Sequence, residues 1–200
     1  MIKISIIFGV AGLFANIVYA NEWWKAISLL NIKIDFPEGL IVGFSIGGIA
    51  SVIYTQLFRK KVEIKKDNNK KKKRLKLFYI LSLLGILFYG SFYVLKLNSL
   101  FSTIIAFIVP TSIIFLKRKD LIKSSIISGF LMVIVALIAY NILEFLTSGW
   151  IQEFWYFKNV PGIILFNLPL DDIIWYFLAG MFISSLYKYW KDGKLIKYKK

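Results

Sequence analysis

The side chains best suited to chemistry in this chain are carboxylates that follow two prolines. Asp171 and Asp172 stand shortly after Pro169, and Glu38 directly follows Pro37. Carboxyl groups can give a proton to a substrate or remove one, which is general acid–base chemistry. The chain of 200 residues has no Cys and no His, so it lacks thiol nucleophiles, imidazole bases and the usual zinc ligands. We therefore expect acid–base chemistry with neither a metal nor a cofactor.

Long apolar segments carry these acids. Of the residues, 58% are hydrophobic and 18% are aromatic, and the mean hydropathy is +0.68. A run of about 20 apolar residues crosses a hydrocarbon core of ~30 Å. Runs of about this length occupy residues 4–20, 40–58, 77–95, 100–116, 126–146 and 173–190. The sequence predicts an all-α, polytopic membrane protein with about six transmembrane helices.

Basic residues gather in segments that this threading places on one side of the membrane. These segments are residues 59–76, residues 117–119 and the tail 193–200. By the positive-inside rule that side is the cytoplasm, so we expect both termini there and a multi-pass protein of the plasma membrane. The net charge of +15 could also indicate nucleic acid. A lysine run beside two spans is more simply an orientation signal that contacts anionic lipid, so no nucleic-acid partner is expected.

The first apolar run has a second interpretation. Lys3, the apolar core and Val18-Tyr19-Ala20 also fit a signal peptide with a small residue at the cleavage point. An internal repeat that needs this helix argues against cleavage.

The segment around the second span recurs around the sixth. With one residue inserted after the proline, Phe44 falls on Phe177, Gly47 on Gly180, Ser51 on Ser184 and Tyr54 on Tyr187. Upstream, Glu22-Trp23-Trp24 and Glu153-Phe154-Trp155 precede their prolines by 15 and 16 residues. We expect two parallel repeats, residues 1–58 with two helices and residues 77–192 with an extra helix. A basic loop, 59–76, joins them, and a basic tail, 193–200, follows.

Both prolines lie on the side opposite to the basic segments, together with most acids. Each feature has a plain alternative, since a proline and an acid can start a helix, tryptophans form interfacial belts and glycines pack helices. Their recurrence on one face favours a site. A carboxyl at the membrane boundary is partly desolvated and can keep a proton, and aromatic faces can stabilise a cation.

These residues resemble the lycopene cyclase domain of the heterodimeric and fused bacterial, archaeal and fungal carotenoid cyclases. The repeat of that family has an aromatic segment with Trp, then a Gly, then Pro-x-acid-acid at the start of a helix. The second unit is similar in Trp155-Tyr156, Gly162-Ile163 and Leu168-Pro169-Leu170-Asp171-Asp172. The first unit departs, because Pro37-Glu38-Gly39 has Gly where the family usually has an acidic pair. It also lacks one of the three helices expected of a full unit.

The resemblance implies cyclisation of the linear ψ-ends of lycopene to ionone rings, without net redox change. An acid would protonate the terminal alkene, the neighbouring double bond would close on the cation, and a base would remove a ring proton. This activity is that of an intramolecular lyase or isomerase in carotenoid biosynthesis. The implied partners are membrane lipid, an apolar polyene substrate and a second cyclase-like subunit or a second copy of the chain.

The resemblance also implies roles for particular residues. It implies Asp171 and Asp172 as the acid and base pair, with Glu38 as their partner from the other repeat. The implied substrate-binding residues are Trp24, Trp155, Trp175, Pro37 and Pro169, with the tryptophans as cation-stabilising walls.

Other functions stay open. An intramembrane prenyltransferase generally needs two Asp-rich clusters for Mg²⁺, and Asp171-Asp172 supplies half of one. A non-catalytic membrane partner or carrier protein that keeps the cyclase-like fold is the stronger alternative, which Gly39 indicates. The chain lacks a G-x-G-x-x-G motif after a strand, which argues against the unrelated flavoprotein cyclases.

Overall fold

Six helices of the structure are long and apolar enough to cross a membrane. The computed structural model describes residues 1–25, 36–64, 70–159 and 162–197. The six helices are α1 (Ile2–Glu22), α2 (Phe36–Leu57), α3 (Lys70–Tyr89), α4 (Ser99–Lys117), α5 (Ile122–Leu146) and α7 (Leu170–Lys191). A π-helical turn, Gly90–Val94, continues α3, and a 3₁₀ turn, Lys119–Leu121, leads into α5. The predicted multi-pass helical class is confirmed. The parallel repeats, the cytoplasmic termini and the division into segments stay predictions.

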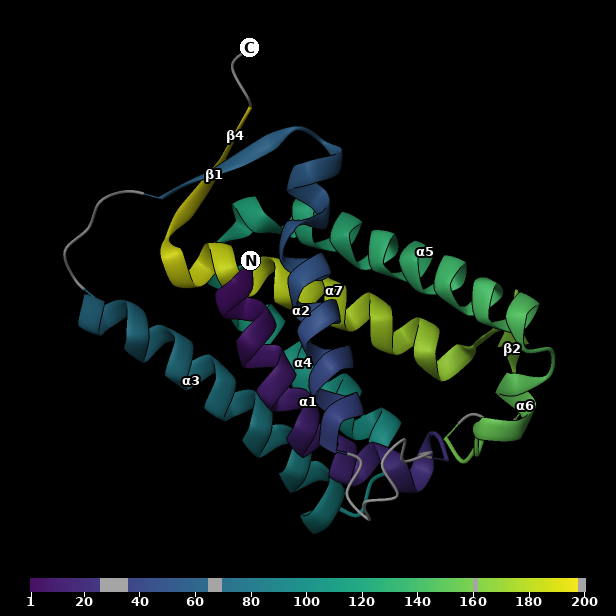
Figure 1. Cartoon of the computed structure of the whole chain (residues 1–200). Helices are drawn as coiled ribbons and strands as arrows, with labels where there is room; N and C mark the ends of the chain where they lie inside the picture. Colours follow the sequence, from purple (N-terminus) through teal and green to yellow (C-terminus); the bar gives the residue numbers. More distant parts are fainter. Residues whose placement is uncertain (26–35, 65–69, 160–161, 198–200) are drawn as a thin grey trace.

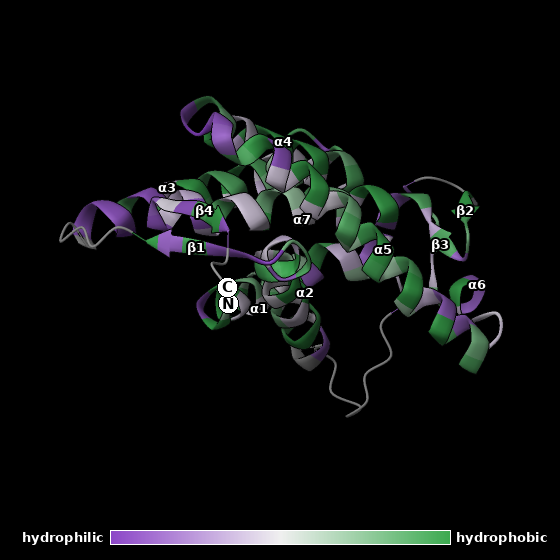
Figure 2. Ribbon diagram, turned by 90° about the horizontal axis from the view of Figure 1, so that it is seen from above, coloured by the Kyte–Doolittle hydropathy of each residue, from purple (hydrophilic) through white to green (hydrophobic). Residues whose placement is uncertain are grey.

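Helix α7 forms the centre of the bundle. Helices α2, α4 and α5 pack against it, α1 packs on α2, and α3 packs on α4 at one edge (Figure 1). The buried apolar residues of α7 include Leu178, Ala179, Phe182, Ile183 and Leu186. Most residues of the helices are hydrophobic (Figure 2), as expected where lipid replaces water as the solvent.

Two helix pairs pack closely through glycine. A Cβ atom on Gly47 of α2 would lie 2.7 Å from the Cβ of Phe8 on α1. A Cβ atom on Gly180 of α7 would lie 2.7 Å from the Cγ of Met132 on α5. A side chain at either position would push its helices apart, so these glycines serve helix packing, as the plain interpretation of the sequence predicted.

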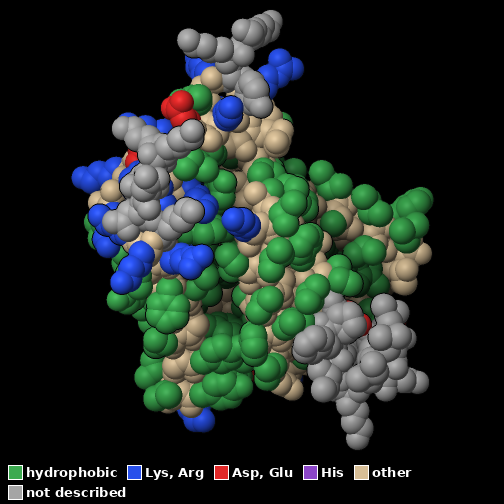
Figure 3. All heavy atoms as spheres, turned by 60° about the vertical axis from the view of Figure 1, so that its left-hand side comes forward, with side chains coloured by type: hydrophobic (Ala, Val, Ile, Leu, Met, Phe, Trp, Pro, Cys, Tyr) green, Lys and Arg blue, Asp and Glu red, His purple; other side chains and the backbone are tan. Residues whose placement is uncertain are grey.

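The basic end of the molecule contains a small sheet. Strand β1 (Lys60–Ile64) pairs antiparallel with β4 (Gly193–Lys197), with Lys60 opposite Lys197. The sequence predicted only a loop and a tail here, because a pairing between segments so far apart leaves no local pattern. Lys and Arg side chains gather at this end, while the body of the molecule is hydrophobic (Figure 3).

The opposite end holds the short elements that position the start of α7. They are α6 (Trp150–Phe154), β2 (Ile164–Leu165) and β3 (Leu168–Pro169), with β2 and β3 forming an antiparallel hairpin. Pro169 ends the hairpin and α7 begins at the next residue. Two acids at this end have structural partners. Glu22 Oε2 accepts the backbone N–H of Ser99, and Glu144 Oε1 accepts that of Gly149.

Candidate acid–base site

Asp171 and Asp172 lie in the first turn of α7 and are buried. They are only 1% and 3% exposed. The backbone N–H of Asp172 donates to Asp171 Oδ1 at 3.1 Å, while Asp171 Oδ2 has no hydrogen-bond partner among the described residues. Acids are favoured at this position because the first helical N–H groups have no partner within the helix and the helix dipole is positive there. The same position leaves one carboxyl oxygen of Asp171 free for another group.

Tyr140 of α5 contacts this pair of aspartates. Its hydroxyl donates to Asp172 Oδ2 at 3.1 Å, and its ring lies 5.7 Å from that of Trp155. The indole Nε1 of Trp155 lies near enough to Asp172 to interact with it, but makes no hydrogen bond of ordinary length and angle. The sequence reasoning missed Tyr140. The available signal was a phenol in an otherwise aliphatic stretch of the fifth span.

The structure brings together tryptophans that are far apart in the sequence. Trp24 and Trp155 form an isolated antiparallel β-bridge, and their ring centroids are 6.2 Å apart. Backbone hydrogen bonds on both sides hold the two segments, from Lys25 N to the Phe154 carbonyl at 2.7 Å and from Tyr156 N to the Trp23 carbonyl at 2.9 Å. The bridge places the aromatic segment that follows α1 beside the one that follows α6.

Tyr19 of α1, which the sequence reasoning also missed, connects Trp175 to this cluster. The Trp175 indole N–H donates to the Tyr19 hydroxyl at 3.1 Å, and the Tyr19 and Thr103 hydroxyls are 2.7 Å apart. Thr103 uses its only hydroxyl proton on the carbonyl of Ser99 at 2.7 Å, so Tyr19 must donate to Thr103. The Tyr19 ring lies 6.0 Å from that of Trp24. Tyr19 therefore contacts both tryptophans, and its hydroxyl proton is already engaged.

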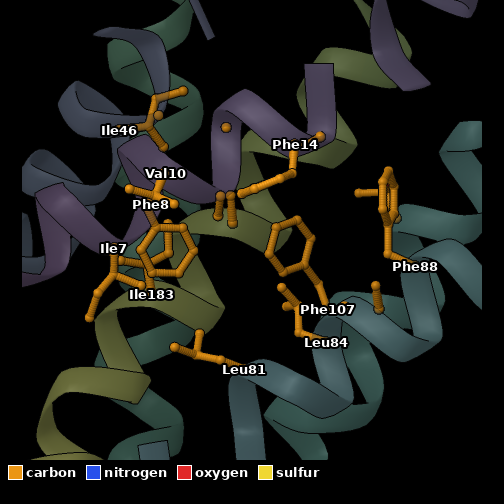
Figure 4. A pocket seen from close by; sticks show the side chains of 18 of the residues that line it. Ile7, Phe8, Val10, Phe14, Ile46, Leu81, Leu84, Phe88, Phe107 and Ile183 are labelled. Atoms are coloured by element: carbon orange, nitrogen blue, oxygen red, sulfur yellow. The ribbon is translucent and has the colours of Figure 1, made fainter. Parts of the chain in front are cut away.

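An apolar cavity of about 520 Å³ lies next to this cluster, with Tyr19 and Trp175 in its wall. Figure 4 shows the cavity from close by. None of the described residues that line it is charged. The aspartates do not line the cavity, but Trp175, which does, follows Asp171 by one helical turn and so lies on the same face of α7. Five helices contribute lining residues, among them Phe8, Val10 and Phe14 of α1, Ile46 of α2, Leu81, Leu84, Gly85 and Phe88 of α3, Phe107 of α4 and Ile183 of α7.

The other predicted site residues lie apart from the aspartates or outside the described part. Glu38 is half-buried in the first turn of α2, and its Oε2 has no hydrogen-bond partner among the described residues. None of the hydrogen bonds or ion pairs of the described residues joins Glu38 to Asp171 or Asp172. The side chain of Pro37 lies outside the described residues. Pro169 is buried, and its strand pairing with Ile164 places the start of α7.

Comparison with known proteins gives one family. Residues 98–190 match the model of the lycopene cyclase family. The match supports a lycopene cyclase domain over this segment. The lycopene cyclase segment includes α4, α5 and α7, and with them Tyr140, Trp155, Asp171, Asp172 and Trp175. No curated protein and no solved structure matches the chain significantly.

The described part of the chain contains no group of three or more acidic side chains that would form a metal site. The geometry offers two neighbouring carboxyl groups, the Tyr140 phenol that binds one of them and a wall of aromatic rings.

Proposed function

We propose that this protein is an integral membrane cyclase that closes the linear ends of lycopene, or of a closely similar polyene, into rings without net redox change. One observation carries the proposal. The segment that matches the lycopene cyclase family places two buried aspartates among aromatic rings, beside an apolar cavity. This arrangement suits an apolar substrate that must be protonated and deprotonated out of contact with water.

Asp171 is the proposed acid. Its free Oδ2 would deliver a proton to the terminal double bond of the polyene, leaving a tertiary carbocation on the chain. The electron pair of the neighbouring double bond then forms the ring C–C bond and moves the positive charge into the ring. Loss of a ring proton to a base restores a double bond. One proton is added and one is removed, so the product is an isomer of the substrate.

Asp172 is the proposed base. The Tyr140 hydroxyl holds its Oδ2, so Asp172 has a fixed orientation beside Asp171. After each cyclisation the proton taken up by Asp172 must return to Asp171, and adjacent positions in one helical turn make this return short. The faces of Trp24, Trp155 and Trp175 would stabilise the cation, because aromatic rings attract positive charge without forming a bond to it.

The test is to express the chain in a bacterium engineered to accumulate lycopene and to separate the extracted pigments. We expect monocyclic or bicyclic carotenes from the unsubstituted protein. Asp171→Asn and Asp172→Asn should each lower ring formation about 10²- to 10⁴-fold, the usual contribution of a general acid or base.

Glu144→Gln is the matched control. Glu144 is another acid at the same end, and its Oε2 also lacks a partner among the described residues. A glutamine keeps the oxygen that accepts the Gly149 N–H, so this variant should form rings normally. Lycopene left unchanged by well-inserted unsubstituted protein would overturn the proposal.

A second candidate function is a non-catalytic partner subunit. Gly39 favours it, because the first unit lacks the acid pair that the second unit has. In that case the chain alone would leave lycopene unchanged. Substituting its aspartates would not alter the activity of a cyclase-like subunit expressed with it.

A further inference from the structure

The apolar cavity opens along the side of the bundle. Ile6, Val10 and Phe14 line it, yet they are 53%, 46% and 58% exposed. Their four-residue spacing places them on one face of α1. Across the cavity, Leu84 and Phe88 of α3 form the opposite wall (Figure 4). Because α1 and α3 are both long and apolar enough to cross a membrane, we expect this opening to face the hydrocarbon core of the bilayer and not an aqueous end.

We propose that this cavity takes up a linear, apolar polyene sideways from the bilayer, between α1 and α3, and that Gly85 sets the room available to it. The identity of this polyene as a substrate rests on the proposed function. The binding itself does not, because it depends only on the shape and chemistry of the cavity.

The chemistry of the lining selects an apolar occupant. The polar side-chain atoms of Tyr19, Thr103 and Trp175 are already hydrogen-bonded to one another. Tyr89 adds one phenol to the lining, and no described lining residue is charged. A charged or strongly polar ligand would lose its hydration there without a replacement. The volume of about 520 Å³ is in the range of small-molecule sites.

A polyene differs from a lipid acyl chain, the other apolar chain in a bilayer, because its double bonds are conjugated. The rings of Phe8, Phe88, Phe107, Tyr19 and Trp175 surround the cavity. Flat aromatic faces suit the flat face of a conjugated chain, whereas a saturated chain gains only general apolar contact. We therefore assign the cavity to a polyene, and lipid occupancy becomes an outcome of the test.

Gly85 is a position at which the cavity can be filled without moving a helix. A Cβ atom on Gly85 would have no atom within 4 Å, so a side chain there grows into empty space. Gly12 also lines the cavity, but a Cβ atom there would collide with the carbonyl of Gly39. Gly90, five residues after Gly85, is equally free of neighbours and is not among the lining residues. It provides a control on the same stretch of chain.

The experiment measures binding in protein that does not turn substrate over. The Asp172→Asn variant is purified in detergent from lycopene-accumulating cells, and the bound pigment is read from its visible absorbance per unit of protein. We expect lycopene to copurify. Adding Gly85→Leu should lower the retained pigment at least about tenfold, which corresponds to ~1.4 kcal/mol of binding. Adding Gly85→Ala should lower it less, and adding Gly90→Leu should leave it unchanged.

Equal retention by the Gly85→Leu and Gly90→Leu proteins, at equal thermal stability, would place the pigment elsewhere and overturn the inference. Absence of pigment from the Asp172→Asn protein, with lipid acyl chains copurifying instead, would overturn it as well. If pigment is retained and lost with Gly85→Leu while the unsubstituted chain forms no rings, the binding inference stands and the proposed cyclisation fails.

Discussion

The α1–α2 pair and the α5–α7 pair use similar contacts at one position and different ones eight residues away. Gly47 packs on Phe8 in the first pair, and Gly180 packs on Met132 in the second. Eight residues before these glycines stand Gly39 and Asp172. Eight residues after Phe8 and Met132 stand Asn16 and Tyr140. The two pairs can therefore be compared position by position along their helices.

The difference between the pairs explains why α7 begins with two acids and α2 with one. A Cβ atom on Gly39 would lie 2.9 Å from the carbonyl oxygen of Gly12 and 3.2 Å from the Cβ of Asn16, so the approach of α1 leaves no room for an aspartate. At the corresponding place in the second pair, Asp172 fits and accepts a hydrogen bond from Tyr140. The first pair has close helix contact where the second has a carboxylate and a phenol.

The largest effect on ring formation should come from replacing the acids that stand immediately before Gly39 and Asp172. Asp171 and Glu38 each have a buried oxygen without a partner among the described residues, but only Asp171 stands beside a second carboxylate. In the lycopene-accumulating strain, Asp171→Asn should reduce ring formation about 10²- to 10⁴-fold. Glu38→Gln should reduce it less than about threefold. Equal losses would show that the two helix pairs contribute equally to the chemistry.

A substitution that disturbs helix packing should instead affect the α1–α2 pair. Gly39→Ala forces a methyl group against the backbone of Gly12, and we expect it to cost about 2 kcal/mol of the free energy of unfolding, as overpacking usually does. Thermal unfolding of the purified protein in detergent measures this cost. Gly90→Ala, which meets no atom within 4 Å, should leave Tm unchanged within a few degrees. A stable Gly39→Ala protein would mean that contact with α1 does not exclude an acid at this position.

A smaller effect is expected at Tyr140. Tyr140→Phe keeps the ring contact with Trp155 and removes the hydrogen bond to Asp172, so ring formation should fall about tenfold while Tm changes little. Tyr79→Phe, at an exposed position of α3, is the control and should have no effect. Unchanged activity of the Tyr140→Phe protein would remove Tyr140 from the site.

The smallest effect should come from the aromatic contact that joins the two halves of the chain. Trp24→Phe replaces the indole whose centroid lies 6.2 Å from that of Trp155 with a smaller phenyl group. Cyclisation should fall about threefold, in line with ~0.5–1.5 kcal/mol for an aromatic pair. Trp190→Phe, at the basic end of α7, tests whether loss of any buried indole has the same result. An effect of similar size from both substitutions would assign Trp24 a structural role alone.

Much of this fold follows from the sequence because a bilayer permits few structures. Inside lipid every backbone polar group must be paired within the segment, so an apolar run of sufficient length has to be a helix. The six helices lie where the apolar runs predicted them, with ends that differ by up to seven residues, most at the start of α3. The β1–β4 pairing and the β2–β3 hairpin were not predicted, since they lie outside the hydrocarbon-length runs and carry no strong local pattern.

The candidate site was only partly visible in the sequence. The acids after Pro169 and the tryptophans stood out by type and by recurrence. Tyr19 and Tyr140 did not, because a single phenol in an apolar helix has no spacing that relates it to a distant carboxylate or indole. Their hydrogen bonds to Thr103 and Asp172 cross 84 and 32 residues of chain.

The amino-acid sequence by itself determined that this chain is helical and membrane-spanning, and which end of its bundle holds the acids, since solvation and helix length depend on local composition. Only the tertiary structure decided which acid acquires a phenol partner and where the apolar cavity lies. The bridge between Trp24 and Trp155, the room beside Gly85 and the exclusion of an acid at Gly39 all depend on how closely two helices approach. That distance is set by side chains on both helices together, and neither helix encodes it alone.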